Sequence, residues 1–185
     1  MSTPIDEGAV RFTFGDEWEV EKYDETGVYR TGLGKLDGSK AVDMVGIHAG
    51  RDIYLIELKD MRTYRIENKG RVGEPLALEV AQKVRDTLAG VSGAARKGLL
   101  GIWKPVARKI PEGKSCVKVV LSLDQDRAPS PFAEQKGKAD LLVLTRKLEQ
   151  KCAWLDCRVL ATNAADAASK IPDLTIQNLP RGTGQ

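Results

Sequence analysis

Two apolar runs stand close together in the first third of the chain, at residues 41–47 and 53–59. Each run is apolar at consecutive positions rather than at alternate ones, which is typical of strands that are buried on both faces of a sheet. The short link between them contains Gly50, and a link of this length favours a tight turn. The pattern therefore predicts an antiparallel hairpin that is covered from both sides.

Amphipathic segments alternate with strands along the rest of the chain. After Pro75, apolar residues recur at every third or fourth position, which predicts a helix that ends near Gly98. Residues 116–123 predict a strand, a second helix follows the prolines at 129–131, and residues 158–162 predict a last strand. This order indicates an α/β domain in which helices flank a mixed central sheet of about four strands.

The segments outside this core have weaker patterns. Residues 18–23 and 27–31 are β-prone on either side of a turn, which predicts an N-terminal β-hairpin. Residues 1–17 predict irregular chain, and residues 99–115 predict a basic loop region. We expect a single domain over residues 1–185, with an N-terminal extension at 1–40, a core at 41–162 and a mobile tail at 172–185.

Composition narrows the class of protein. Charged residues make up 30% of the 185 residues and hydrophobic residues 42%, which suits a globular protein rather than a disordered one. No apolar run approaches the roughly 20 residues that span a bilayer, and the first residues lack the pattern of a signal peptide. Three cysteines without CxxC spacing and a single histidine argue against a zinc cluster or a disulfide framework. We therefore expect a reduced, cytoplasmic protein that does not enter a membrane.

Several enzyme classes lack their motifs. The chain contains no GxSxG, no GxGxxG and no GxxxxGK[ST], which argues against a serine hydrolase, a dinucleotide-binding fold and a P-loop enzyme. If the protein is an enzyme, we therefore expect its catalysis to depend on carboxylates, lysines and a metal ion.

Charge is uneven along the chain. Residues 1–57 hold 6 basic and 12 acidic residues, a net charge of −6, whereas residues 58–118 hold 14 and 6, a net charge of +8. A basic middle third favours a phosphate-binding surface, because lysine and arginine release the counterions of nucleic acids. The alternative is that the basic and acidic segments form a solvated surface and neutralise each other in the folded chain.

Two carboxylates and a lysine are predicted to share one face of the hairpin. If the hairpin is symmetric about Gly50, Asp43 lies opposite Glu57, with Cβ atoms about 5 Å apart. Lys59 lies two residues beyond Glu57 and therefore points to the same face. A register shift of one residue would place the two carboxylates on opposite faces.

Two facing carboxylates at the end of an apolar hairpin need compensating charge. Lys59 supplies one positive charge, and Mg²⁺ favours a site of one or two carboxylates with water and phosphate oxygens. Such a cation would polarise a phosphodiester, while Lys59 orients or deprotonates water or stabilises the transition state. A strand-end ion pair between Glu57 and Lys59 is the structural alternative. The spacing E-x-K occurs five times, but only at Glu57 does it fall inside an apolar strand.

The sequence Asp43, then Glu57-Leu58-Lys59 on the next strand, then an amphipathic helix and a further β–α–β stretch, resembles the PD-(D/E)xK nuclease superfamily. The resemblance covers roughly residues 41–162 and implies a restriction-endonuclease-like core. It also implies Asp43 and Glu57 as ligands of Mg²⁺ or Mn²⁺ and Lys59 as the catalytic lysine. Gln82, on the following helix, matches a glutamine that some relatives place near the site.

The chain also departs from the pattern of this superfamily. Val42 stands where the name of the motif has proline, and the N-terminal segment predicts a hairpin where the superfamily core begins with a helix. An additional acidic residue from that helix has three candidates here, Glu17, Glu19 and Glu25.

Basic residues follow the candidate strand and extend the hypothesis to substrate binding. Beside such a site, a basic loop would grip the phosphate backbone, and an exposed loop paired with acidic residues is the alternative. The loop residues are Arg62, Arg65, Lys69 and Arg71. On the following helix, Lys83 is interpreted as the partner of Glu79 in a helix-stabilising pair.

The resulting hypothesis is a metal-dependent nuclease that hydrolyses nucleic acid, with DNA as the expected substrate. The first alternative is a catalytically inactive nuclease-like domain that binds nucleic acid or a protein partner within a larger defence or repair system. The second alternative is an α/β interaction domain that carries the motif by chance. A homodimer, or a subunit of a larger complex, is compatible with all three.

Overall fold

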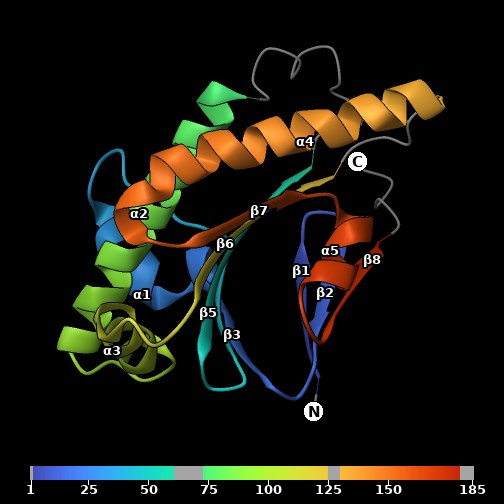
Figure 1. Cartoon of the computed structure of the whole chain (residues 1–185). Helices are drawn as coiled ribbons and strands as arrows, with labels where there is room; N and C mark the ends of the chain where they lie inside the picture. Colours follow the sequence, from blue (N-terminus) through green and yellow to red (C-terminus); the bar gives the residue numbers. More distant parts are fainter. Residues whose placement is uncertain (1, 61–72, 125–129, 180–185) are drawn as a thin grey trace, which may run out of the picture.

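The computed structural model describes residues 2–60, 73–124 and 130–179. These residues form three layers, in which helices cover one face of a central sheet and a second, smaller sheet covers the other (Figure 1). The strands are β1 (Thr3–Glu7), β2 (Val10–Phe14), β3 (Trp18–Lys22), β4 (Met44–His48), β5 (Asp52–Asp60), β6 (Val117–Asp124), β7 (Arg158–Thr162) and β8 (Leu174–Asn178). The α-helices are α1 (Gly27–Arg30), α2 (Glu74–Arg96), α3 (Trp103–Glu112), α4 (Pro131–Cys152) and α5 (Ala164–Lys170). In the described ranges, no helix combines the length and apolarity needed to cross a membrane.

The central sheet is mixed and has the order β3-β4-β5-β6-β7. The strands β3, β4 and β5 pair antiparallel, whereas β5, β6 and β7 pair parallel. The predicted α/β class with a mixed sheet is confirmed. The described sheet has five strands rather than about four, because β3 joins it along β4.

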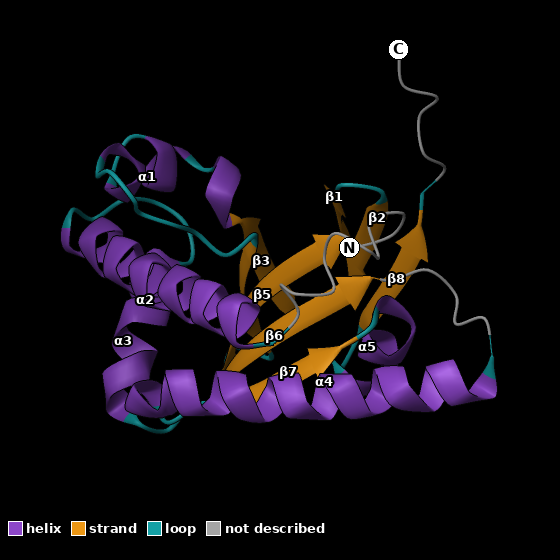
Figure 2. Ribbon diagram, turned by 90° about the horizontal axis from the view of Figure 1, so that it is seen from above, coloured by secondary structure: helices purple, strands orange, loops and turns teal. Residues whose placement is uncertain are grey.

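Both faces of the central sheet are buried, as the consecutive apolar positions predict. Val45 and Leu55 pack with α2, α3 and α4 in one hydrophobic cluster. Met44 and Ile56, their immediate neighbours in the chain, pack with β1, β2, α5 and β8 in another. Figure 2 shows the two layers on opposite sides of the sheet. Successive side chains of β4 and β5 therefore point alternately to the helices and to the small sheet.

The register of the β4–β5 hairpin agrees with the prediction. Ile47 pairs with Ile53 and Val45 with Leu55, so the hairpin is symmetric about Gly50. Gly50 has a φ of 61°, a left-handed conformation that glycine adopts without steric cost. The tight turn thus fixes the pairing from which the position of Asp43 opposite Glu57 follows.

Helix α2 forms where the periodicity predicts it. Pro75 stands in its first turn, where its missing N–H is not needed. The apolar residues that recur along one face of this helix are buried in the core: Leu76, Val80, Val84, Leu88 and Val91. The helix ends at Arg96, two residues before Gly98, which has a φ of 69°.

The two ends of the chain differ from the prediction. Residues 3–7 and 10–14, expected to be irregular, form the β1–β2 hairpin, and β8, in the tail expected to be mobile, pairs with β2. Figure 1 shows the blue hairpin beside the red β8. Val10, Phe12 and Phe14 alternate with polar residues and are buried against the second face of the central sheet. The small sheet forms because that face would otherwise expose apolar side chains.

The predicted secondary structure of two further segments, 27–31 and 99–115, is wrong. Residues 27–31 were expected as the second strand of an N-terminal hairpin, but Gly27–Arg30 form α1 after a strand that ends at Lys22. The Thr26 hydroxyl accepts a hydrogen bond from the Tyr29 N–H, so a helix cap outweighs local β propensity. Within the predicted loop at 99–115, the buried Trp103 and Val106 anchor helix α3 to the core.

Candidate functional site

Asp43 and Glu57 meet at the end of the hairpin, on the face that α2 covers. Asp43 immediately precedes β4, and its Oδ2 accepts a hydrogen bond of 2.7 Å from the N–H of Leu58. The exposed fractions of Asp43 and Glu57 are 7% and 1%. This bond from the backbone of β5 to the Asp43 side chain holds the Asp43 carboxylate beside Glu57. Both predicted ligand residues therefore lie in one buried place.

Two lysines converge on one oxygen of Glu57. Lys83, on α2, donates to Glu57 Oε1 at 2.6 Å, and Lys59 lies 3.0 Å from the same oxygen. Lys83 Nζ also lies 3.7 Å from Asp43 Oδ1, and Lys59 Nζ lies 2.8 Å from Glu79 Oε1. Lys59 and Glu57 therefore share a face as predicted, and α2 adds a second ammonium group between the carboxylates.

The other oxygen of Glu57 is unsatisfied. Glu57 Oε2 is buried and has no hydrogen-bond partner among the described residues. A buried carboxylate oxygen without a partner is costly, and its presence points to a missing ligand. Asp43 Oδ1 and Glu57 Oε1 both contact Lys83 Nζ, at 3.7 Å and 2.6 Å, so they lie closer together than the about 8 Å beyond which two carboxylates cannot share one cation. The donor set therefore fits a hard divalent cation such as Mg²⁺.

The electrostatics of this centre favour additional positive charge. Burial, with Glu57 nearby, raises the pKa of Asp43 to about 7, although the Leu58 N–H and Lys83 oppose the shift. Burial also raises the pKa of Glu57 above its usual range, despite its contacts with Lys83 and Lys59. The two lysines thus leave the carboxylate pair short of full compensation.

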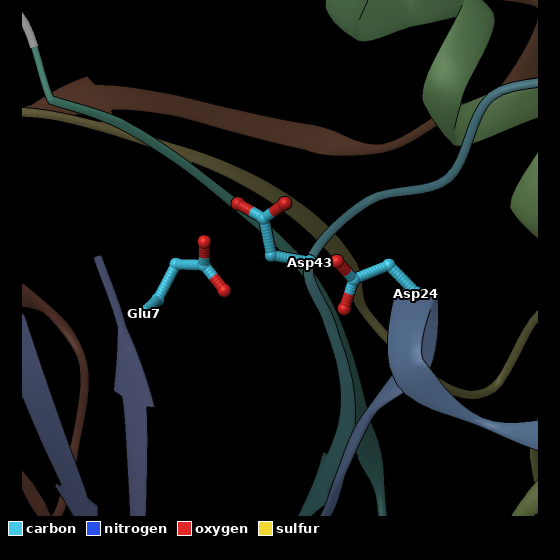
Figure 3. A group of neighbouring side chains, drawn as sticks. All are labelled: Glu7, Asp24 and Asp43. Atoms are coloured by element: carbon cyan, nitrogen blue, oxygen red, sulfur yellow. The ribbon is translucent and has the colours of Figure 1, made fainter.

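A second acidic grouping shares Asp43. One carboxylate oxygen from each of Glu7, Asp24 and Asp43 lies within 4.8 Å of the others (Figure 3). Figure 3 shows Glu7 on β1 and Asp24 on the 3-10 helix after β3, with Asp43 between them. Glu7 forms an ion pair with Lys22 at 3.0 Å, and Asp24 Oδ1 is buried with no hydrogen-bond partner within the described ranges. Burial and the nearby Glu7 raise the pKa of Asp24.

The remaining predicted residues are Gln82, on α2, and four basic residues that follow β5 in the chain. Gln82 Oε1 accepts a hydrogen bond of 3.0 Å from Lys40 Nζ. The predicted phosphate-binding residues Arg62, Arg65, Lys69 and Arg71 lie outside the described residues.

Four residues near Asp43 and Glu57 were not predicted from the sequence. Lys83 and Glu79 were interpreted as a pair within the helix, but each forms an ion pair with a residue of the hairpin. Their position on the polar face of the helix that follows the candidate strand is a signal that could have found them. Glu7 and Asp24 had no such signal, because they depend on how the N-terminal segment folds back.

Comparison with known proteins gave no match: no protein-family model, no curated protein and no solved structure matches the chain.

Proposed function

We propose that this protein is a metal-dependent nuclease that hydrolyses phosphodiester bonds of nucleic acid, with DNA as the expected substrate. The observation that carries the proposal is Glu57 Oε2, which is buried beside the buried Asp43 and has no hydrogen-bond partner in the part of the chain that the structure describes. The run of β4, β5, α2, α3, β6, α4 and β7 supports a restriction-endonuclease-like core, because it follows the order that the resemblance implies apart from the additional α3.

In this proposal, Asp43 and Glu57 would hold the cation, which would supply polarisation of the phosphodiester and activation of water. Lys59 extends from the same face as Glu57 and is 25% exposed, so its ammonium group can reach a bound substrate. There it donates a hydrogen bond to a non-bridging phosphate oxygen, where negative charge develops in the transition state. Glu79 positions Lys59 through the ion pair at 2.8 Å.

A second function has an observation in its favour. Lys83 Nζ already lies between Asp43 and Glu57, where it supplies part of the charge that a cation would supply. A domain in which this lysine stays in place would bind nucleic acid or a protein partner without cleaving it. Both functions use the same fold, so only an assay of cleavage separates them.

The test is a cleavage assay on single- and double-stranded DNA and RNA with Mg²⁺, Mn²⁺ or EDTA. The variants E57Q and K59A are compared with E134Q, because Glu134 belongs to another E-x-K sequence, on the exposed start of α4. We expect cleavage that EDTA abolishes, that E57Q and K59A reduce by at least about 100-fold, and that E134Q leaves unchanged. Binding without cleavage by the wild-type protein would contradict the nuclease and support the second function.

A further inference from the structure

Lys83 occupies the position that a shared cation needs. Its Nζ lies 2.6 Å from Glu57 Oε1 and 3.7 Å from Asp43 Oδ1, so it stands between the two carboxylates. The Lys83 side chain is 17% exposed, and the Glu57 side chain that it contacts is 1% exposed. The contact is therefore an ion pair that is largely shielded from water, and such charged hydrogen bonds are stronger than those at a surface.

A divalent cation that binds Asp43 and the Glu57 Oε2, which has no hydrogen-bond partner among the described residues, comes close to the ammonium group that the same two carboxylates already hold. Mg²⁺ binds carboxylate oxygens at about 2 Å, which would place it close to a nitrogen that is itself in contact with Glu57 Oε1. Two positive centres at such a separation repel each other strongly in a poorly hydrated place. Cation binding therefore requires that the Lys83 side chain leave the space between the carboxylates.

A second acceptor for the displaced lysine lies nearby. Asp24 Oδ1 is buried and has no hydrogen-bond partner among the described residues. One carboxylate oxygen of Asp24 lies within 4.8 Å of one of Asp43, and Asp43 Oδ1 lies 3.7 Å from Lys83 Nζ. The flexible four-carbon stem of lysine allows the ammonium group to exchange partners without a change in the helix.

We propose that Lys83 is an internal counter-ion, which holds Asp43 and Glu57 together in the free protein and is displaced when a divalent cation binds. This inference rests on the proposed function, because it concerns the regulation of the same site. It assigns Lys83 the role of setting cation affinity, so that the site binds a divalent cation more weakly than its carboxylates alone would allow.

The test is the affinity for Mn²⁺, measured from the electron paramagnetic resonance signal of the free ion. K83Q keeps a hydrogen-bond donor for Glu57 but removes the charge, and we expect it to bind Mn²⁺ about tenfold more tightly than the wild type. K83R keeps the charge and should stay within about threefold of the wild type. The matched control is K118Q, which removes a lysine that is ion-paired at 3.0 Å with Asp52, near the turn at the far end of the hairpin, and should not change the affinity.

The outcomes separate this inference from the proposed function. If E57Q abolishes Mn²⁺ binding and K83Q strengthens it, or if K83Q alone binds, the inference is supported. If the wild type binds and E57Q does not, but K83Q binds equally or more weakly, the counter-ion role is overturned while the metal site stands. If no variant binds Mn²⁺, both proposals fail. Thermal unfolding of K83Q and K83R checks that each variant is folded.

Discussion

Replacement of Asp43 by asparagine should stabilise the metal-free protein, and increasingly so as the pH rises. The Asp43 carboxyl is buried beside Glu57, and its pKa is raised from 3.8 to about 7. A raised carboxyl pKa means that the folded state binds the proton more tightly than the unfolded state does. The stability of the wild type therefore falls as the pH rises from about 4 to about 7, and the loss persists above that range. D43N removes this loss, and its amide oxygen can still accept the Leu58 N–H.

The magnitude follows from the displacement of the pKa. A shift of roughly 3 pH units corresponds to about 4 kcal/mol between the two protonation states. We therefore expect the difference in unfolding free energy between D43N and the wild type to grow by about 4 kcal/mol from pH 4 to pH 8. Such a change is a large part of the total stability of a small domain.

The assay is urea unfolding followed by circular dichroism, in EDTA, at several pH values between 4 and 8.5. The control is D52N, because Asp52 is as buried as Asp43 but has the opposite shift. Burial raises the pKa of Asp52, but the hydrogen bonds from Arg51 and Lys118 outweigh it and lower the pKa to about 2. D52N should therefore be less stable than the wild type at neutral pH. A D43N effect that is independent of pH, or that follows the sign of D52N, would refute the reasoning.

Three further outcomes test the packing around the site. On α2, a methyl group at Gly90 would overlap the Tyr23 hydroxyl, so G90A should lower the unfolding free energy by about 1–3 kcal/mol. The nearby Gly93 has open space, and G93A should raise it by about 0.5–1 kcal/mol; equal effects in urea titrations would contradict this packing. T87V should cost about 1–3 kcal/mol, because the buried Thr87 hydroxyl accepts the Val42 N–H next to Asp43. T87S keeps that acceptor and should cost less, whereas a T87V protein as stable as the wild type would show that the bond contributes nothing.

The central strands and the candidate site could be predicted because they depend on local rules. The alternation of side chains and the glycine turn fix the register, and the register alone places Asp43 opposite Glu57 and Lys59 on the same face as Glu57. The periodicity of α2 similarly determines which of its faces is buried. These inferences need only the spacing of residues within one hairpin or one helix.

The contacts that complete the centre could not be predicted in the same way. Lys83 reaches Glu57 only because α2 packs across the end of the hairpin, and Glu7 approaches Asp43 only because the N-terminal hairpin pairs with a strand from the other end of the chain. The polar face of a helix can equally well form pairs with itself, as the spacing of Glu79 and Lys83 suggested. Tertiary packing determines that residues of α2 form ion pairs with the hairpin, and the spacing of residues in the sequence carries no information about that packing.

The central claim, that Asp43 and Glu57 bind one divalent cation, is tested most directly by anomalous diffraction from crystals soaked in Mn²⁺. We expect an anomalous peak about 2 Å from an oxygen of each carboxylate, with the Lys83 ammonium group withdrawn from between them. A map without a peak at this place, in which Lys83 still bridges the two carboxylates, would contradict it.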